Sequence, residues 1–399
     1  MKDKDIFSVI LILILVTLPI GFAINSTAVI FLFVFTLYRV LFKKNKVKLS
    51  IIPILLITLY VFSFLSLIWT TDIENTKEAL IRFLSYLVIP LSFIFNSDIK
   101  VDKHKIICFF LKSLVLFAIY CLVLGLIKSL KNSDISYLFY HKLSNNFKEL
   151  NAIYLSAYTS FVICFLIHKK NKSKLDKIIF LLLGIFLILL SSKIIIFITF
   201  LIVLFFFVGK LKYEKVKFQR LLLVLGISLF FLMAMSNLSK RVKIEFEKTK
   251  IEEVLSKKDF GHVYLWTGSG LRAFQTKVFF EILKENEKLL LGFGLNNSQK
   301  SLNNKYKEYN LYPGFFGYNY HNQYIQTFAE LGLIGFSIVL ILLFLIIRNA
   351  IIYKDYFLLC FIIIILAVCF TESFLWRQRG MIFFITTTLL LIKTKRIST

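Results

Sequence analysis

The chain has 399 residues, of which 58% are hydrophobic and only 18% are charged. A soluble domain of this length carries more charge and fewer apolar runs, so the composition excludes an ordinary globular enzyme. The formal net charge of +26 would suggest a nucleic-acid-binding protein if the chain were soluble. In a membrane protein, Lys and Arg in short cytoplasmic loops account for such an excess, so we expect membrane lipids and no nucleic acid as partners.

Apolar runs recur along the whole chain. We predict an all-α, polytopic membrane protein with about 12 transmembrane helices, since each run is long enough to cross a hydrocarbon core of roughly 30 Å. The predicted spans cover residues 6–24, 27–42, 51–69, 79–95, 106–127, 152–167, two arms within 178–208, 221–235, 324–347, 356–370 and 381–392. The first span is interpreted as uncleaved, because its apolar core is longer than that of a typical signal peptide. We expect a turn around Asn25-Ser26 and an acidic loop over 71–78.

The run 178–208 is interrupted at Lys193 and the two serines before it. The loops on both sides, 169–177 and 210–220, are rich in Lys and Arg, which places both in the cytoplasm. The run must then cross the membrane twice, with Lys193 at the outer turn. Because the two arms are short, we expect this turn to dip into a cavity lined by protein.

The distribution of Lys and Arg over the short loops predicts that both termini are cytoplasmic. The longest polar segment then becomes one large, partly helical periplasmic loop. We divide the chain into residues 1–236 with spans one to nine, 237–322 with the loop, and 323–399 with spans ten to twelve and a cytoplasmic tail. The sequence contains no internal repeat that would indicate an inverted-repeat transporter.

Two residues of the predicted loop stand out chemically. Arg272 lies at the start of a predicted helix, 271–286, where a helix N-terminus disfavours positive charge. An Arg at this position either holds an anion, which the helix amides also attract, or is an ordinary surface residue. His321 lies at the mouth of span ten, and a neutral imidazole can take a proton from a hydroxyl.

Other polar residues surround these two in the sequence. Asn322 follows His321, and Glu330, Gly332 and Gly335 follow at fixed offsets. Further ionisable groups lie in or near spans, where they are functional candidates by default although long cations also snorkel. These groups are Arg82, Lys112, Lys193, Glu372, Arg377 and Arg379.

Familiar catalytic motifs are absent from the sequence: there is no P-loop, HExxH, CxxC pair or GxSxG. The five cysteines lie in apolar segments without metal-ligand spacing, so we expect no disulfide framework. No cofactor is expected. A site outside the cytoplasm has no nucleotide sugar available. A pre-activated, lipid-linked donor is therefore the natural substrate.

At these residues the chain resembles the O-antigen ligase and polymerase superfamily of bacterial membrane glycosyltransferases. The stretch HNQYIQTFAELGLIG from His321 is similar to the family's His-Asn and Glu-x-Gly-x-x-Gly pattern. Arg272, a helix and then LLLGFGLNNS are similar to its Arg–helix–Gly-x-Gly arrangement. LLSSKIII is similar to a Ser-Arg turn between spans, with Lys193 in place of the Arg. The layout of spans with one large late loop is also similar.

The resemblance implies a glycan linked to undecaprenyl pyrophosphate as the donor, and lipid A core or another glycan as the acceptor. It implies His321 as the general base on the acceptor hydroxyl, and Arg272 and Lys193 as the cations that stabilise the departing pyrophosphate. It further implies a bacterial inner membrane protein that needs no metal. The residues expected to bind substrate are Asn322, Glu330, Gly292, Gly294 and Tyr318.

Three functions stay open at this level. A ligase and a repeat-unit polymerase use the same donor and differ in the acceptor, and the junction from His-Asn to Glu-x-Gly favours the ligase. A transporter of lipid-linked glycans would also place cations at membrane depth. The large outer segment and the absence of repeats argue against the transporter.

Overall fold

A computed structural model describes residues 2–43, 47–145, 150–211, 251–262, 266 and 268–393. Within these residues every regular element is a helix, which confirms the all-α prediction. The predicted span 221–235 and the first part of the polar segment lie outside the described residues.

Several helices are long and apolar enough to cross a membrane. Five such segments are found among the described residues, and four shorter apolar helices accompany them. The five are Phe22–Phe42, Ile51–Ile68, Ile73–Phe95, Lys103–Asn132 and Gln323–Ile352, and the shorter four are Ala152–His168, Lys193–Phe207, Tyr356–Cys369 and Gln378–Ile392. The multi-pass architecture is therefore supported, and the number of 12 spans stays a prediction.

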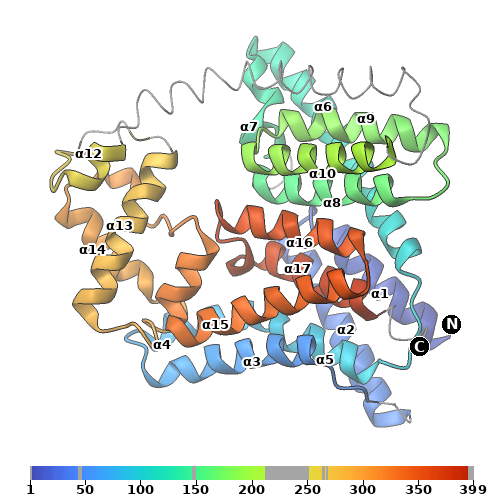
Figure 1. The fold of residues 1–399 in the computed structure, drawn as a ribbon, viewed down its shortest axis with the longest axis horizontal. Coiled ribbons are helices and arrows are strands. Elements are labelled where there is room, and N and C mark those ends of the chain that lie inside the picture. Colours follow the sequence, from blue (N-terminus) through green and yellow to red (C-terminus); the bar gives the residue numbers. More distant parts are fainter. Residues whose placement is uncertain are drawn as a thin grey trace.

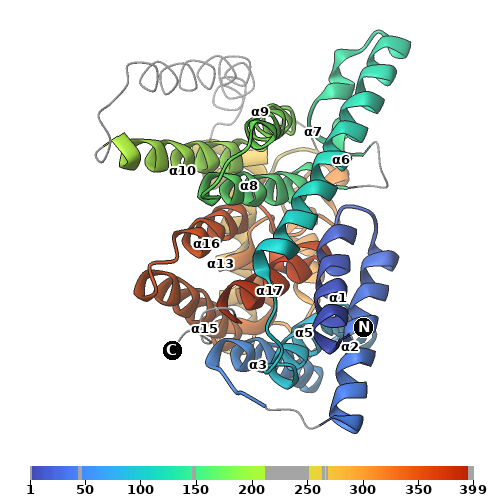
Figure 2. The ribbon, with the colours of Figure 1, turned by 90° about the vertical axis from the view of Figure 1, so that its right-hand side faces the viewer.

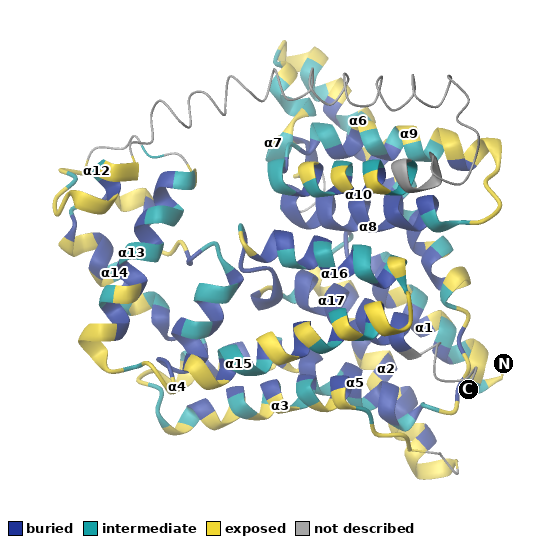
Figure 3. Cartoon of the chain, viewed as in Figure 1, coloured by how far each residue is buried: buried dark blue, intermediate teal, exposed yellow. Residues whose placement is uncertain are grey.

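The helices form a layered bundle. Its helices are α1 (Asp3–Thr17), α2 (Phe22–Phe42), α3 (Ile51–Leu65), α4 (Ile73–Phe83), α5 (Ser85–Phe95), α6 (Lys103–Asn132), α8 (Ala152–His168), α9 (Lys174–Leu189), α10 (Lys193–Leu211), α15 (Gln323–Ile352), α16 (Tyr356–Cys369) and α17 (Gln378–Lys393). In both views α16 and α17 lie between a layer of α8 to α10 and a layer of α3 and α15 (Figure 1 and Figure 2). The burial map shows α8 and α17 dark along most of their length (Figure 3), so these two helices form the centre of the core.

Two predicted boundaries are wrong. The first turn lies between α1 and α2, before Asn25, and the Asn25 amide inside α2 donates to the Ile14 carbonyl at 2.7 Å and the Thr17 hydroxyl at 2.9 Å. The predicted acidic loop 71–78 is helical from Ile73, because the Asp72 carboxylate caps α4 by accepting the Asn75 amide. A buried side-chain contact between α2 and α1 accommodates the polar residue at the first place, and a helix cap starts α4 at the second.

The predicted break near Lys193 is confirmed. The helix α9 ends at Leu189 and α10 begins at Lys193, and Ser191 between them has a left-handed φ of 54°. A positive φ is uncommon for a residue with a Cβ and ends regular helix geometry. The run is therefore two helices joined by a tight turn.

One buried charge cluster joins three helices at the end of the bundle where the chain begins. Arg39 near the end of α2 donates two hydrogen bonds to Asp98 at 3.1 and 2.7 Å and one to Asn96 at 3.0 Å. Its Nε lies 3.4 Å from Asp3, at the start of α1. The beginning of α1, the end of α2 and the segment after α5 are therefore fixed together.

The described part of the polar segment forms a separate helical subdomain at the opposite end of the bundle, which we call the loop end (Figure 1). It contains α12 (Ile251–Ser256), α13 (Gly268–Asn286), α14 (Ser298–Glu308) and the short helix η3 (Pro313–Phe315). These elements have their own apolar core, which includes Phe274, Val278, Leu302, Tyr306 and Phe315. The helix predicted over 271–286 is confirmed and begins slightly earlier, at Gly268.

Candidate functional site

His321 lies on a tight turn at the mouth of α15. Its φ of 46° is left-handed, and its backbone amide donates to the Asn319 side chain at 3.0 Å. A residue with a Cβ holds such a conformation only where its surroundings over-determine it, and these residues concentrate at functional sites. The turn thus fixes the direction of the imidazole.

The subdomain holds this turn from behind. The Gln275 side chain on α13 donates to the Asn319 carbonyl at 2.6 Å and to the Tyr306 hydroxyl at 2.8 Å. Tyr306, on α14, donates to the Tyr318 carbonyl at 3.1 Å. Since both Gln275 and Tyr306 are buried, the position of His321 depends on the packing of α13 against α14.

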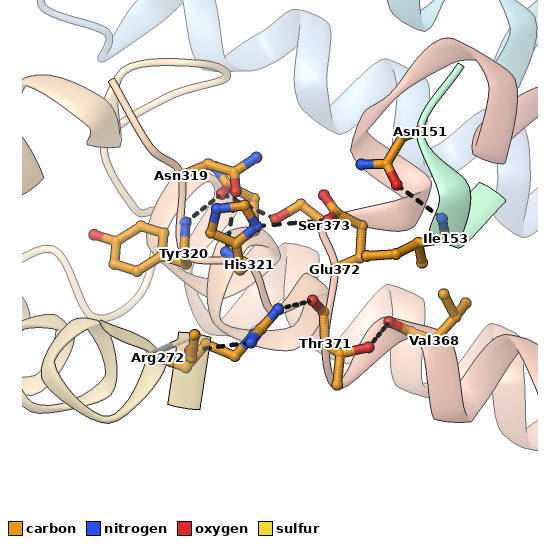
Figure 4. A network of polar contacts seen from close by, with 12 residues as sticks. Asn151, Ile153, Arg272, Asn319, Tyr320, His321, Val368, Thr371, Glu372 and Ser373 are labelled. Atoms are coloured by element: carbon orange, nitrogen blue, oxygen red, sulfur yellow. Dashed lines mark hydrogen bonds and ion pairs between the residues drawn. The ribbon is translucent and has the colours of Figure 1, made fainter. Parts of the chain in front are cut away.

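The imidazole faces a buried carboxylate. His321 Nδ1 lies 3.5 Å from Oε2 of Glu372, which follows α16 (Figure 4). Glu372 is only 5% exposed, and its surroundings keep it charged. Burial raises the pKa of this carboxyl, but the His321 contact and two nearby Arg charges outweigh burial and leave the pKa below its ordinary value.

Arg272 reaches the same segment from α13. Its Nη2 donates to the Thr371 carbonyl at 2.9 Å, and its Nη1 donates to the Gly268 carbonyl at 3.0 Å (Figure 4). The Arg272 charge also acts on Glu372. The structure therefore brings the predicted Arg272 and His321 together across residues 371–372, although they lie on different elements.

Two predicted substrate-binding residues flank His321. The Asn322 side chain caps α15 by accepting the backbone amides of Tyr324 at 2.9 Å and Ile325 at 3.2 Å. The Tyr318 ring stands nearly perpendicular to the His321 ring, with 5.6 Å between their centroids, and is 48% exposed. Asn322 has a clear structural function as a cap, whereas Tyr318 is open to a ligand. Substrate binding by either residue stays a prediction.

The joint between the subdomain and α15 contains the predicted residues Gly292, Gly294 and Glu330, together with Gly332. Gly332 has non-helical angles, φ 62° and ψ −166°, so the helix is kinked there. The backbone groups that the kink releases pair with the turn that contains Gly292 and Gly294. Phe293 and Gly294 donate to the carbonyls of residues 329 and 330, and the amides of residues 333 and 334 donate to the carbonyls of residues 289 and 290.

Glu330 is engaged in the same joint. Its buried carboxylate accepts the Asn297 amide at 2.8 Å, the Ser298 hydroxyl at 2.5 Å and the Gln326 side chain at 2.9 Å. It therefore holds the start of α14. These contacts give Glu330 and the glycines of the joint a positioning function, and direct binding of substrate by them stays a prediction.

Lys193 begins α10, and the turn that precedes it lies at the loop end of the bundle (Figure 1). It belongs to the α9–α10 pair, which is a different part of the bundle from the elements that carry His321 and Arg272. The structure thus places Lys193 at the same end as the other two predicted catalytic residues, on a separate element.

A comparison with protein families adds an independent observation. Residues 178–340 match the family model described as O-antigen ligase, and none of the curated proteins matches the chain. The match confirms the resemblance to the O-antigen ligase superfamily. It includes Lys193, Arg272 and His321, while Glu372 lies beyond its end.

The family match and the apolar helices together support a multi-pass membrane protein that is similar to O-antigen ligases. Members of this family are ligases and related polymerases that act as glycosyltransferases. The sequence analysis named Glu372 only as an ionisable group near a span and gave it no function. The available signal was an ionisable residue close to a predicted membrane span. The contact of Glu372 with His321 could be seen only in the folded structure.

The close approach at Gly332 gives a testable prediction. A Cβ at this position would lie 2.2 Å from the Leu290 carbonyl oxygen, so we expect Gly332→Ala to separate α15 from the turn it contacts. The expected loss of stability is about 1–3 kcal/mol, measured as a lower melting temperature in detergent.

The matched control is Gly184→Ala in α9, where a Cβ meets nothing within 4 Å. That variant should melt at or slightly above the wild-type temperature, because Ala is favoured over Gly by about 0.5–1 kcal/mol inside a helix. Equal melting temperatures for Gly332→Ala and Gly184→Ala would show that the joint tolerates displacement.

Proposed function

We propose that the protein transfers a polysaccharide from undecaprenyl pyrophosphate to an acceptor hydroxyl, in the manner of an O-antigen ligase with lipid A core as the acceptor. The observation that supports this best is the contact between His321 and Glu372 beside Arg272. It provides a base, a group that orients the base and a cation within one site at the mouth of a membrane helix. This is the set of groups that glycosyl transfer from a lipid pyrophosphate needs.

His321 is the general base in this proposal. With Nδ1 facing a carboxylate, the favoured neutral tautomer carries its proton on Nδ1 and leaves the Nε2 lone pair for the acceptor. Nε2 accepts the hydroxyl proton while the acceptor oxygen forms a bond to the anomeric carbon. The bond from that carbon to the pyrophosphate oxygen breaks, and undecaprenyl pyrophosphate leaves with the electron pair.

Glu372 is a positioning residue. It orients the imidazole and stabilises the imidazolium that forms when His321 takes the proton. Its carboxyl pKa below the ordinary range supports this function, because an ionised carboxylate is required. The carboxylate touches His321 and is not itself proposed to contact the substrate.

The cations complete the site. Arg272 already binds two carbonyls, and its buried Nε has no hydrogen-bond partner within the described residues. Such a guanidinium can bind phosphate oxygens as negative charge grows on the leaving group. Lys193 is proposed to contribute a second charge from the α9–α10 turn.

The proposal places the site on the periplasmic face of the inner membrane, with both termini in the cytoplasm. The alternative acceptor is another lipid-linked repeat unit, which would make the protein a polymerase. Polysaccharide from a deletion strain distinguishes the two, because loss of a ligase leaves long chains unattached to lipid A, whereas loss of a polymerase leaves single repeats on the core. A glycosidic product formed in detergent, without any gradient, separates both from a transporter.

Replacement of His321 with Ala should reduce transfer by about 10²–10⁴-fold, the usual contribution of a general base. The measurement is the rate of glycan transfer by purified protein, with membrane insertion checked by extraction yield. His104→Ala is the control, because His104 lies on the first turn of α6, where its ring is next to Cys108 and Phe165. Transfer by His321→Ala at a rate near that of His104→Ala would contradict the assignment.

Replacement of Glu372 with Gln should lower kcat by roughly 10²-fold and leave the KM for the donor unchanged, because the variant loses only the charge that supports the base. Initial rates over a range of donor concentrations give both constants. The control is Glu74→Gln, an exposed residue paired with Lys77 on α4. An unchanged kcat in Glu372→Gln would remove Glu372 from the mechanism.

Replacement of Arg272 with Lys should also impair transfer, by roughly tenfold, because the bidentate guanidinium fork is lost while the charge remains. Steady-state kinetics with the lipid-linked donor test this. Lys277→Arg on the same helix is a suitable comparison, since the Lys277 ammonium donates to the Lys257 carbonyl and lies over the Tyr309 ring, away from Thr371 and Glu372. Full activity of Arg272→Lys would make Arg272 a structural residue.

A further inference from the structure

A second pair of arginines meets at the loop end, where α4 packs against the short helix η4 (Phe374–Trp376). The Phe83 and Trp376 rings are edge to face with 4.9 Å between their centroids, and the Tyr86 hydroxyl donates to the Leu375 carbonyl at 3.3 Å. Arg82 directly precedes Phe83, and Arg377 directly follows Trp376. The aromatic contact brings the backbone at residues 82–83 close to that at residues 376–377, and the two guanidinium charges act on each other.

Arg82 is incompletely satisfied by the protein. Its Nη2 reaches the Asn296 side chain at a long 3.4 Å, and its buried Nε has no hydrogen-bond partner in the part of the chain that the structure describes. Asn296 is itself held in place by Asn75, through hydrogen bonds of 2.7 and 3.1 Å. The partner of Arg82 is thus fixed, and it leaves most of the guanidinium fork unused.

The carboxylates near Arg82 do not bind its guanidinium directly in the part of the chain that the structure describes. Glu330 and Glu78 act on Arg82 at a distance, but neither forms an ion pair with it among the described residues. The oxygens of Glu330 are already taken by Asn297, Ser298 and Gln326. Two like charges held together at a membrane surface repel each other unless an anion lies between them.

The pair is also placed to reach the proposed reaction. Arg377 is exposed, and it lies within electrostatic range of Glu372, the partner of His321. A ligand held by Arg82 and Arg377 would therefore lie on the side of Glu372 reached from α4, whereas Arg272 approaches from α13. Guanidinium forks match the geometry of phosphate oxygens, which makes a phosphoryl group the fitting anion.

We propose that Arg82 and Arg377 form a phosphoryl-binding site adjacent to the His321–Glu372 contact and separate from Arg272 and Lys193. This inference rests on the proposed glycosyl transfer. The phosphoryl group belongs either to the lipid pyrophosphate of the donor or to a phosphate carried by the acceptor. The experiment distinguishes these two sources.

Purified full-length protein in detergent is titrated with undecaprenyl pyrophosphate, which binds without turnover, and with undecaprenol as the probe that lacks phosphate. Binding is followed by microscale thermophoresis for the wild type, Arg82→Gln and Arg377→Gln. If the donor is bound, each variant loses about tenfold or more in affinity for undecaprenyl pyrophosphate, with no change for undecaprenol. The KM for the lipid-linked donor should rise in parallel.

If the acceptor is bound, the affinity for undecaprenyl pyrophosphate stays constant and the KM for the acceptor rises by a similar factor. That rise should disappear when the acceptor is dephosphorylated. Lys77→Gln, on the same helix as Arg82 and exposed, is the matched control and should change none of these values. Either pattern supports the site.

Affinity and both KM values within twofold of the wild type in Arg82→Gln and Arg377→Gln would overturn the inference. Because Arg377 is exposed, its variant keeps the test decisive if Arg82→Gln does not fold. Failure of the proposed function gives a different result: the wild type forms no glycosidic product, while the binding titration still reports on the two arginines.

Discussion

The structure depends on one exchange of backbone hydrogen bonds at the kink of α15. In a regular helix the carbonyls of residues 329 and 330 would accept the amides of residues 333 and 334. Gly332 breaks both bonds, and the turn 289–294 supplies a partner for each of the four released groups. Unpaired backbone groups near a bilayer are costly, so the kink and the turn require each other. Glycine is needed in both segments, the turn and the kinked helix, because their backbones are too close for a Cβ at Gly292 or Gly332.

This joint connects the membrane bundle to the proposed chemistry through a short series of contacts. The carboxylate of Glu330, next to the kink, fixes the start of α14. The helix α14 carries Tyr306, which with Gln275 on α13 holds the turn before His321. The helix α15 begins directly after that turn. The imidazole is thus tied at both sides to the same membrane helix, which limits its movement relative to Glu372.

The sequence predicted the parts whose signals are local. Apolar runs gave the helical class, and a polar interruption gave the turn before Lys193. The motif residues Arg272 and His321 both approach residues 371–372, and their catalytic function stays a prediction. Two loops were misplaced because single side-chain hydrogen bonds set the helix boundaries there. The Asn25 side chain inside α2 bonds to α1, and the Asp72 side chain caps α4 within an acidic stretch. The pairing of His321 with Glu372 was also beyond reach, because the two residues are brought together only by the packing of α15 against α16.

The motif Glu-x-Gly-x-x-Gly illustrates a second limit of reading a sequence. Its spacing suggested residues that bind a substrate, yet the structure engages Glu330 and Gly332 in internal contacts. A motif indicates that particular residues are required, and it does not reveal whether they touch the ligand or hold the residues that do. Here the geometry of the backbone explains the need for glycine without any ligand.

The charge balance at the loop end explains why such a rigid site suits a lipid pyrophosphate. Arg272 and Arg377 both act on the Glu372 carboxylate, and Arg82 lies beside Arg377. Glu372 faces His321, while Glu330 and Glu78 act on Arg82 only from a distance. The buried Nε groups of Arg82 and Arg272 have no hydrogen-bond partner among the described residues, so they are available to an anion at the loop end of the bundle. Charges act strongly in such surroundings, because little water is present to screen them. A leaving group that becomes more negative during the reaction is stabilised there without rearrangement of the protein. A neutral leaving group would gain no extra stabilisation from these cations in the transition state relative to the ground state. The cations therefore favour a donor whose leaving group is a phosphoryl group.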